Sequence, residues 1–322
     1  MYRSFYGLQG KPFELSPSSD VVYLSDSHQE ALATLRYGVI SDKGFLLLTG
    51  GIGTGKTTIL NCLLKMVKEK VRVCVLNNPT LTRHEFYSFL AAKLGLAFDG
   101  DKAHFLVHFA QLLQDFHQNR QKILLIIDEA QVFPLELLEE VRLLSNQAGE
   151  DNVLSIFLIG QPELQEVLSH PRLLPLRQRI GINYHLRPFG RGDTERYIAY
   201  RLNKAGAANP VLFTEAAIER IHQASSGNPR LINIICDHAL VSGFVRSSKL
   251  IDGEIVEECV NELRLPGEPG LTLSPGSELE NSRPVKRRSR ARRINSATAM
   301  LSVLTLVAAV GVLFYYLGWI SW

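Results

Sequence analysis

The sequence has few cysteines and no repeats. Only four of its 322 residues are cysteines, scattered with no CxxC pair, at Cys62, Cys74, Cys236 and Cys259. A short disulfide scaffold is therefore excluded, and we expect reduced thiols in a cytoplasmic body. Glycine and proline, 24 and 14 residues, are near average, and no segment recurs at a fixed period, which excludes collagen and solenoid folds. No GxSxG motif occurs, so the elbow of a serine hydrolase is absent.

The net charge is small, and the sequence does not begin with an apolar leader. The first residues lack the apolar stretch of a signal peptide, so the N-terminal part is expected to stay in the cytoplasm. The net charge is +3, but residues 266–322 hold seven basic and three acidic side chains, which leaves the first 265 residues at −1. That balance argues against a strong affinity of the N-terminal body for nucleic acid.

One long apolar run lies near the C-terminal end. Residues 297–320 carry no charge, and about 20 apolar residues suffice to cross a hydrocarbon core. Tyrosines and tryptophans gather at its far end, and the seven basic residues precede it. The pattern predicts a transmembrane helix with the N-terminal body in the cytoplasm, hence a single-pass protein of the inner (cytoplasmic) membrane. The basic run could also contact nucleic acid or anionic lipid, but its position beside the span favours a role in topology.

The segment between body and span, 266–296, is rich in Pro, Gly and Ser and then basic, which predicts a flexible basic linker.

Within the body, five apolar runs of strand length alternate with amphipathic stretches. The predicted strands are 44–50, 71–77, 123–128, 154–160 and 182–186, and the predicted helices between them include 56–70, 83–94, 104–116 and 135–145. Continuous apolar strands are typical of a parallel sheet covered on both faces, so we expect an α/β, doubly wound core.

After about residue 190 the strand pattern stops. Plausible helix N-caps follow at Asp193, Thr214, Asn228 and Asp252, and glycines at 206 and 227 follow predicted helix ends. The sequence therefore predicts a core over residues 1–190 and a small all-helical second domain over 191–265.

A phosphate-binding loop follows the first predicted strand. Residues 50–57 match GxxxxGK[ST] between a strand and a helix, the context that this motif requires. The predicted nucleotide-binding residues are Gly50, Gly51, Ile52, Gly53, Thr54, Gly55, Lys56, Thr57 and Thr58. Glycines let backbone N–H groups surround phosphate oxygens at the positive end of a helix dipole. We expect Lys56 to neutralise the β- and γ-phosphates of ATP and the Thr57 hydroxyl to bind Mg²⁺.

Two adjacent acids end the third predicted strand. Residues 123–127 are apolar and lead into Asp128 and Glu129, which brings carboxylates to the carboxyl edge of the sheet, beside the phosphate loop. Asp128 is suited to orient the Mg²⁺ ion. Glu129 can act as the base that positions and deprotonates the attacking water. A solvated turn is the alternative interpretation of this pair.

Hydrolysis also needs fixed donors that meet charge on the transferred phosphoryl group. Gln161 follows the fourth predicted strand, Arg177 and Arg179 precede the fifth, and Arg230 opens a helix of the small domain. Each is a candidate, and each could instead be an ordinary exposed polar residue.

Several motifs together carry a resemblance to a known family. They are GGIGTGKTT, ILLIIDEAQ, LIGQPEL, LRQRI, YIAYRLNKAG, GNPRLINIICDHAL and the opening FYGLQGKPFELSP. Over about residues 1–265 the sequence resembles the AAA+ ATPases of the general secretion pathway protein A group, which includes ATPases of exosortase and polysaccharide export loci. The resemblance implies a P-loop AAA+ core with a parallel five-stranded sheet, followed by a small helical lid.

The resemblance also implies roles for single residues. Gln161 would be sensor 1, Arg179 an arginine finger that acts in a neighbouring subunit, and Arg230 sensor 2. Asn77 or Asn78 would restrain Glu129 until a partner binds, and the segment 2–23 would pack beside the adenine. A finger that acts in a neighbour requires self-association, most plausibly as a ring.

These observations predict a membrane-anchored ATPase. We expect it to hydrolyse ATP with Mg²⁺ and to act on a protein partner in an envelope secretion or polysaccharide export system. Secretion-type members often continue past the span into a peptidoglycan-binding domain, whereas this sequence stops two residues after it, so the shorter export-linked forms are the better match. The alternative is an ATP-dependent switch or DNA-bound regulator like the ATPases of transposition, or a membrane adaptor without turnover.

Overall fold

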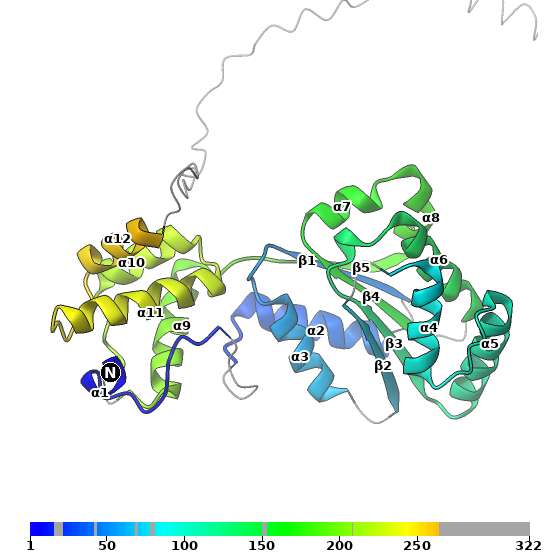
Figure 1. Ribbon diagram of the computed structural model, residues 1–322, viewed down its shortest axis with the longest axis horizontal. Coiled ribbons are helices and arrows are strands. Elements are labelled where there is room, and N and C mark those ends of the chain that lie inside the picture. The colour runs from blue at the N-terminus through cyan, green and yellow to red at the C-terminus, as the bar shows by residue number, and fades with distance from the viewer. Residues whose placement is uncertain are drawn as a thin grey trace, which may run out of the picture. The chain divides into compact units, whose positions relative to one another are not determined.

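The computed structural model describes residues 1–15, 22–41, 44–67, 70–77, 81–149, 153–207 and 209–263 (Figure 1). The predicted linker and the predicted span at 297–320 lie outside these ranges. A search of the described helices finds none that combines the length and the apolar character needed to cross a membrane.

A parallel five-stranded sheet forms the centre of the core, as predicted. The strands are β1 Phe45–Gly50, β2 Val71–Leu76, β3 Lys122–Ile127, β4 Leu154–Gly160 and β5 Ile180–Leu186. Their order is β2-β3-β4-β1-β5, and every neighbouring pair is parallel. In the inner strands β1 and β4 every residue is buried, because helices cover both faces. The edge strand β5 instead alternates between half-buried and exposed positions over most of its length.

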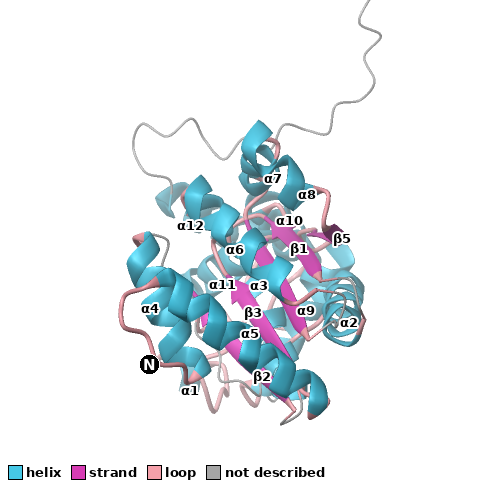
Figure 2. Ribbon diagram, turned by 90° about the vertical axis from the view of Figure 1, so that its right-hand side faces the viewer, coloured by secondary structure: helices cyan, strands magenta, loops and turns pink. Residues whose placement is uncertain are grey.

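Helices cover the two faces of this sheet (Figures 1 and 2). One face packs against α4 Arg83–Leu94, α5 Lys102–Gln118 and α6 Leu135–Gln147, and the other against α2 Asp26–Ile40 and α3 Lys56–Met66. Two short helices, α7 Glu163–Leu168 and α8 Leu174–Arg177, precede β5. The four amphipathic stretches therefore became helices where the sequence predicted them, except that α3 ends at Met66 and not at residue 70. The short helices α7 and α8 were not predicted from the sequence.

Residues beyond 190 form helices, as expected from their pattern. They are α9 Arg191–Lys204, α10 Glu215–Ser225, α11 Pro229–Val245 and α12 Gly253–Leu263. Thr214 and Asn228 cap α10 and α11 through their side chains, and Asp252 accepts a hydrogen bond from the first turn of α12. The predicted cap at Asp193 was wrong: α9 begins two residues earlier, after Gly190, and Asp193 lies in its first turn, paired with Arg196.

The N-terminal segment packs against these helices. The residues of α1 Tyr2–Phe5 and the following turn join the apolar cluster of α9 to α12. The buried guanidinium of Arg201 on α9 donates to the carbonyl oxygens of Pro12 and Glu14, at 2.5 and 2.9 Å. Residues 1–15 therefore extend the core of the helical part, an arrangement that no sequence pattern predicted.

Candidate functional site

The loop between β1 and α3 has the backbone of a phosphate cradle. Gly53 and Gly55 have φ values of +77° and +103°, which a residue with a side chain adopts only under strain. A Cβ at Gly55 would also lie 2.8 Å from Nε2 of His28. Lys56 begins α3 directly after the loop, so the free N–H groups of the first helical turn point toward it.

The side chain of Lys56 is folded over this loop. It is buried, and its ammonium donates to the carbonyl oxygens of Gly50 and Gly51 at 2.7 and 3.0 Å. Burial lowers the pKa of Lys56, while the charges of Glu129 and Asp128 oppose that shift. A cation is therefore held where phosphate oxygens would approach the loop.

The two acids stand at the end of β3, beside the loop. Burial raises the pKa of Asp128, and its Oδ1 accepts a hydrogen bond from the backbone N–H of Glu129 at 3.0 Å. Two amides contact Oε2 of Glu129: Nε2 of Gln131 at 2.7 Å and Nε2 of Gln161 at 3.4 Å. The ends of β3 and β4 thus bring an acid and an amide together at one edge of the sheet, as predicted from their positions.

Residues of the helical part close the other side of the site. A cavity of about 520 Å³ is lined by the phosphate loop, by Glu129 and Gln161, and by Arg230 and Asn233 of α11. Asn228 reaches the loop directly, because its Nδ2 donates to the carbonyl oxygen of Ile52 at 2.6 Å. Polar groups of the phosphate loop, of the ends of β3 and β4, and of α11 therefore surround one cavity that is large enough for a nucleotide.

Most of the predicted nucleotide-binding residues line this cavity. They are Ile52, Gly53, Gly55, Lys56, Thr57 and Thr58. The carbonyls of Gly50 and Gly51 bind Lys56, while Thr54 is buried below the loop and its hydroxyl donates to Gly51. The hydroxyl of Thr57 and the carboxylate of Asp128 are hard oxygen donors, the kind that Mg²⁺ prefers, so the residues present suit an ATP–Mg²⁺ complex.

The two arginines before β5 lie elsewhere. Arg179 is exposed, and its guanidinium donates to the hydroxyl of Ser145 on α6 at 2.7 Å. Arg177 is exposed at the end of α8. Neither lines the cavity.

The resemblance implied that Asn77 or Asn78 restrains Glu129, and only Asn77 lies in the described part of the chain. Asn77 is exposed after β2 and makes no hydrogen bond to Glu129 among the described residues, and Asn78 lies outside them. The side chains that hold the carboxylate are Gln131 and Gln161. Of the N-terminal segment, Leu15 lines the nucleotide cavity, and Tyr23 lines a smaller pocket that also contains Gly55 and Thr58.

Sequence reasoning gave no role to several residues of the site. His28 is buried, and its Nε2 lies 2.9 Å from the carbonyl oxygen of Thr54 in the loop. Gln131 stood in the quoted DEAQ motif without a function, and Arg201 stood in YIAYRLNKAG. For Asn228 a helix-capping role was predicted, but not the contact with Ile52. Only their presence in the family motifs could have drawn attention to the last three.

Comparisons with known proteins show what this chain is similar to. Residues 39–168 match a family described as "AAA domain". General secretion pathway protein A of Aeromonas hydrophila is 41% identical over 260 residues, which are 79% of this chain and 47% of that protein. The chain thus spans about half the length of this relative. An uncharacterized HTH-type transcriptional regulator of Methanocaldococcus jannaschii is 22% identical over 274 residues, covering 73% of this chain and 66% of the regulator.

Solved structures show the fold. Cdc6p from Pyrobaculum aerophilum has a TM-score of 0.60 at 18% identity and covers 78% of this chain and 70% of its own. A chain of Drosophila ORC bound to DNA has a TM-score of 0.57 at 17% identity and covers 81% of this chain and 65% of its own. At this identity the likeness concerns the fold alone. Together with the AAA domain match over residues 39–168, it confirms the predicted α/β P-loop AAA+ fold with its parallel five-stranded sheet.

Proposed function

We propose that this chain, an AAA+ protein related to general secretion pathway protein A, is an ATPase that hydrolyses ATP with Mg²⁺. One observation carries the proposal: a single cavity brings together Lys56, Glu129, Gln161 and Arg230 beside a phosphate loop. A binding cradle alone would not need an acid and an amide opposite the lysine. Phosphoryl transfer does, because water must be oriented and the developing charge must be met by fixed donors.

Each residue has a role in this proposal. Lys56 leaves its loop carbonyls and binds the β- and γ-phosphates. Thr57 and Asp128 would hold Mg²⁺, which would neutralise phosphate charge. Glu129 accepts a proton from the attacking water. Gln161 lies within 3.4 Å of Glu129 and can contact the same water or the γ-phosphate.

We propose that Arg230 and Arg179 act on opposite sides of a contact between two subunits. Arg230 opens α11 and lines the cavity, so it can contact the γ-phosphate within one subunit as sensor 2. Arg179 is exposed on another surface, where it can reach the nucleotide of a neighbour. We therefore propose that turnover requires self-association in a ring.

The proposed cellular location and partner system rest on the similarity to general secretion pathway protein A and on the apolar run at residues 297–320. We propose that the ATPase is anchored in the inner membrane by residues 297–320 and drives assembly or operation of a secretion or polysaccharide export system with an envelope partner. The relationship to general secretion pathway protein A and the apolar run at residues 297–320 support this proposal. Val307→Arg together with Val310→Arg should move the full chain from the membrane to the soluble fraction; unchanged sedimentation with membranes would contradict the anchor.

Two substitutions test the site. Lys56→Ala should weaken ATP binding at least about 100-fold, because it removes a buried cation from the phosphates. Glu129→Gln should keep ATP bound while turnover falls at least about 100-fold. The full chain in membranes is assayed for ATP affinity and phosphate release, with Lys93→Ala on α4 as a control.

The controls decide between turnover and simple binding. Lys93 lies on the sheet face opposite to α3, so its removal should change neither quantity. ATP binding without turnover above that of Glu129→Gln would instead indicate a nucleotide-dependent switch and would refute the ATPase proposal. Normal hydrolysis by Lys56→Ala would refute the site.

A further inference from the structure

The carboxylate of Glu129 is held by a side chain to which the sequence motifs give no role. Gln131 lies two residues after Glu129, on a short 3₁₀ turn, and its Nε2 donates to Oε2 of Glu129 at 2.7 Å. Its Oε1 accepts from the backbone N–H of Gln161 at 3.0 Å. One amide therefore bridges the acid at the end of β3 to the first residue after β4.

The backbone is shaped to allow this bridge. Glu129 has φ = 52°, a left-handed conformation that costs a non-glycine residue about 1 kcal/mol or more. That conformation turns the chain so that residue 131 reaches back to residue 129. Gly160 at the end of β4 leaves room for the amide, since a Cβ there would lie 2.5 Å from Oε1 of Gln131.

The pattern of donors distinguishes the two oxygens of the acid. Gln131 and Gln161 both contact Oε2, and no described residue donates a hydrogen bond to Oε1. With Oε2 fixed by amide donors, the carboxylate cannot rotate freely, and Oε1 is left as the oxygen that can accept a proton. A base held in one orientation reacts faster, because about 1 Å of misplacement can cost 100-fold in rate.

We propose that Gln131 is a positioning residue that holds Glu129 by Oε2 and directs Oε1 toward the attacking water. The inference rests on the proposed ATPase function and deepens it. Gln131 does not line the nucleotide cavity. Its loss should therefore change turnover and leave ATP affinity unchanged.

Two substitutions at Gln131 separate its two hydrogen bonds. Gln131→Met keeps the length of the side chain and removes both bonds, and kcat should fall about 10- to 100-fold while the Kd for ATP changes less than about threefold. Gln131→Glu keeps an acceptor for the N–H of Gln161 but replaces the donor to Glu129 by an oxygen, so kcat should fall at least as far. Full activity of Gln131→Glu would overturn the proposal.

A second perturbation does not alter the amide itself. Gly160→Ala places a methyl group against Oε1 of Gln131 and should displace the bridge. The expected result is again a lower kcat with unchanged ATP affinity. If Gly160→Ala and Gln131→Met both kept wild-type kcat, the proposal would be wrong.

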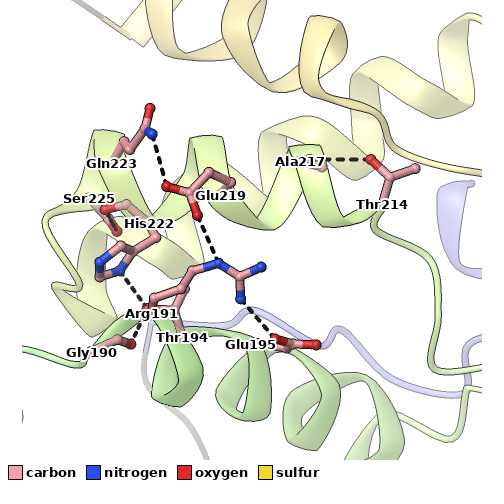
Figure 3. Close-up of polar contacts among 10 residues, drawn as sticks. All are labelled: Gly190, Arg191, Thr194, Glu195, Thr214, Ala217, Glu219, His222, Gln223 and Ser225. Carbon is pink, nitrogen blue, oxygen red and sulfur yellow. Dashed lines mark hydrogen bonds and ion pairs between the residues drawn. The ribbon is translucent and has the colours of Figure 1, made fainter.

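Two measurements exclude a merely structural effect. In a Glu129→Gln background, Gln131→Met should cause no further loss, because the group that it positions is already inactive; an additive loss would overturn the proposal. The matched control is Gln223→Met on α10, which removes the same kind of amide-to-carboxylate bond, Gln223 to Glu219 at 2.9 Å, from the surface of the helical part (Figure 3). Its kcat should equal that of the wild type.

The wild-type chain separates the two proposals. If it turns over ATP faster than Glu129→Gln but the Gln131 variants match the wild type, only the positioning role fails. If the wild type is no faster than Glu129→Gln, the proposed function fails, and Gln131 then has no base to position.

Discussion

Replacing Asn228 by serine should isolate one contact between the helical part and the phosphate loop. The side chain of Asn228 makes two kinds of bond: Oδ1 accepts from the N–H of Arg230 at 3.0 Å as the cap of α11, and Nδ2 donates to the carbonyl oxygen of Ile52 at 2.6 Å. Serine can still cap a helix but is too short to replace the second bond. A cap and a neutral hydrogen bond each contribute about 1 kcal/mol. Asn228→Ser should therefore lower the free energy of unfolding by about 1 kcal/mol, and Asn228→Ala by about 2 kcal/mol.

The same bond should affect ATP binding. Ile52 lies at the turn of the loop, and fixing its carbonyl oxygen orders the backbone that receives the phosphates. If the loop must be ordered anew on binding, a loss of about 1 kcal/mol corresponds to roughly fivefold weaker affinity. Calorimetric titration of the full chain with ATP and Mg²⁺ measures this affinity for the wild type, Asn228→Ser and Asn228→Ala, and denaturant unfolding measures stability.

Thr214 provides the matched control. It caps α10 by accepting the N–H of Ala217 at 3.2 Å, in the same helical part, and does not line the nucleotide cavity (Figure 3). Thr214→Ala should cost about 1 kcal/mol of stability and leave ATP affinity unchanged. The reasoning is refuted if Asn228→Ser binds ATP as tightly as the wild type, or if Thr214→Ala weakens ATP binding to the same degree.

Two further predictions concern other sites. Burial raises the pKa of Glu140, but hydrogen bonding with Lys102 at 2.6 Å and the charge of Arg83 contribute to holding it below its ordinary 4.5. Its stabilising contribution is therefore present above pH 4.5 and lost as the pH falls below that value. Glu140→Gln should lower the free energy of unfolding by about 2–4 kcal/mol at neutral pH and flatten the acid limb of the stability–pH curve, and an unchanged curve would contradict this prediction. Arg179→Ala should lower ATP turnover about 100-fold with unchanged ATP affinity, measured by phosphate release and titration, whereas an equal loss of affinity would make Arg179 a structural residue.

The fold could be predicted because its signals are local. Apolar runs of five to seven residues can form buried strands only if helices cover them, so the run at 154–160 determined β4 to the residue. The predicted helix starts were taken from residues that often cap helices, and one of these predictions failed. Asp193 is a common N-cap residue, but α9 begins after Gly190. Both residues are acceptable at that position, and only tertiary packing distinguishes them.

The site could be predicted where both partners lie in one motif, or where the topology of a parallel sheet brings the ends of two strands together. The lysine and the glycines of the loop are neighbours in sequence, and the strand rule brings Glu129 and Gln161 to the same edge of the sheet. The bridge through Gln131 could not be predicted, because it depends on the left-handed conformation of Glu129 and on the space above Gly160. Neither property is encoded in residue type or spacing.

The order of the phosphate loop itself comes from distant residues. Burial lowers the pKa of His28. Its Nε2 donates to the carbonyl oxygen of Thr54 at 2.9 Å, because a carbonyl oxygen can only accept, and its Nδ1 lies 2.6 Å from the hydroxyl oxygen of Ser25. Asn228, which lies 176 residues after Ile52 in the sequence, donates a hydrogen bond from Nδ2 to the carbonyl oxygen of Ile52. In a trans peptide the N–H points opposite to the carbonyl, so fixing these two carbonyls also fixes the N–H groups of Gly53 and Gly55. The cradle for phosphate is thus oriented by one residue that precedes the core sheet, His28, and by one at the start of α11, Asn228.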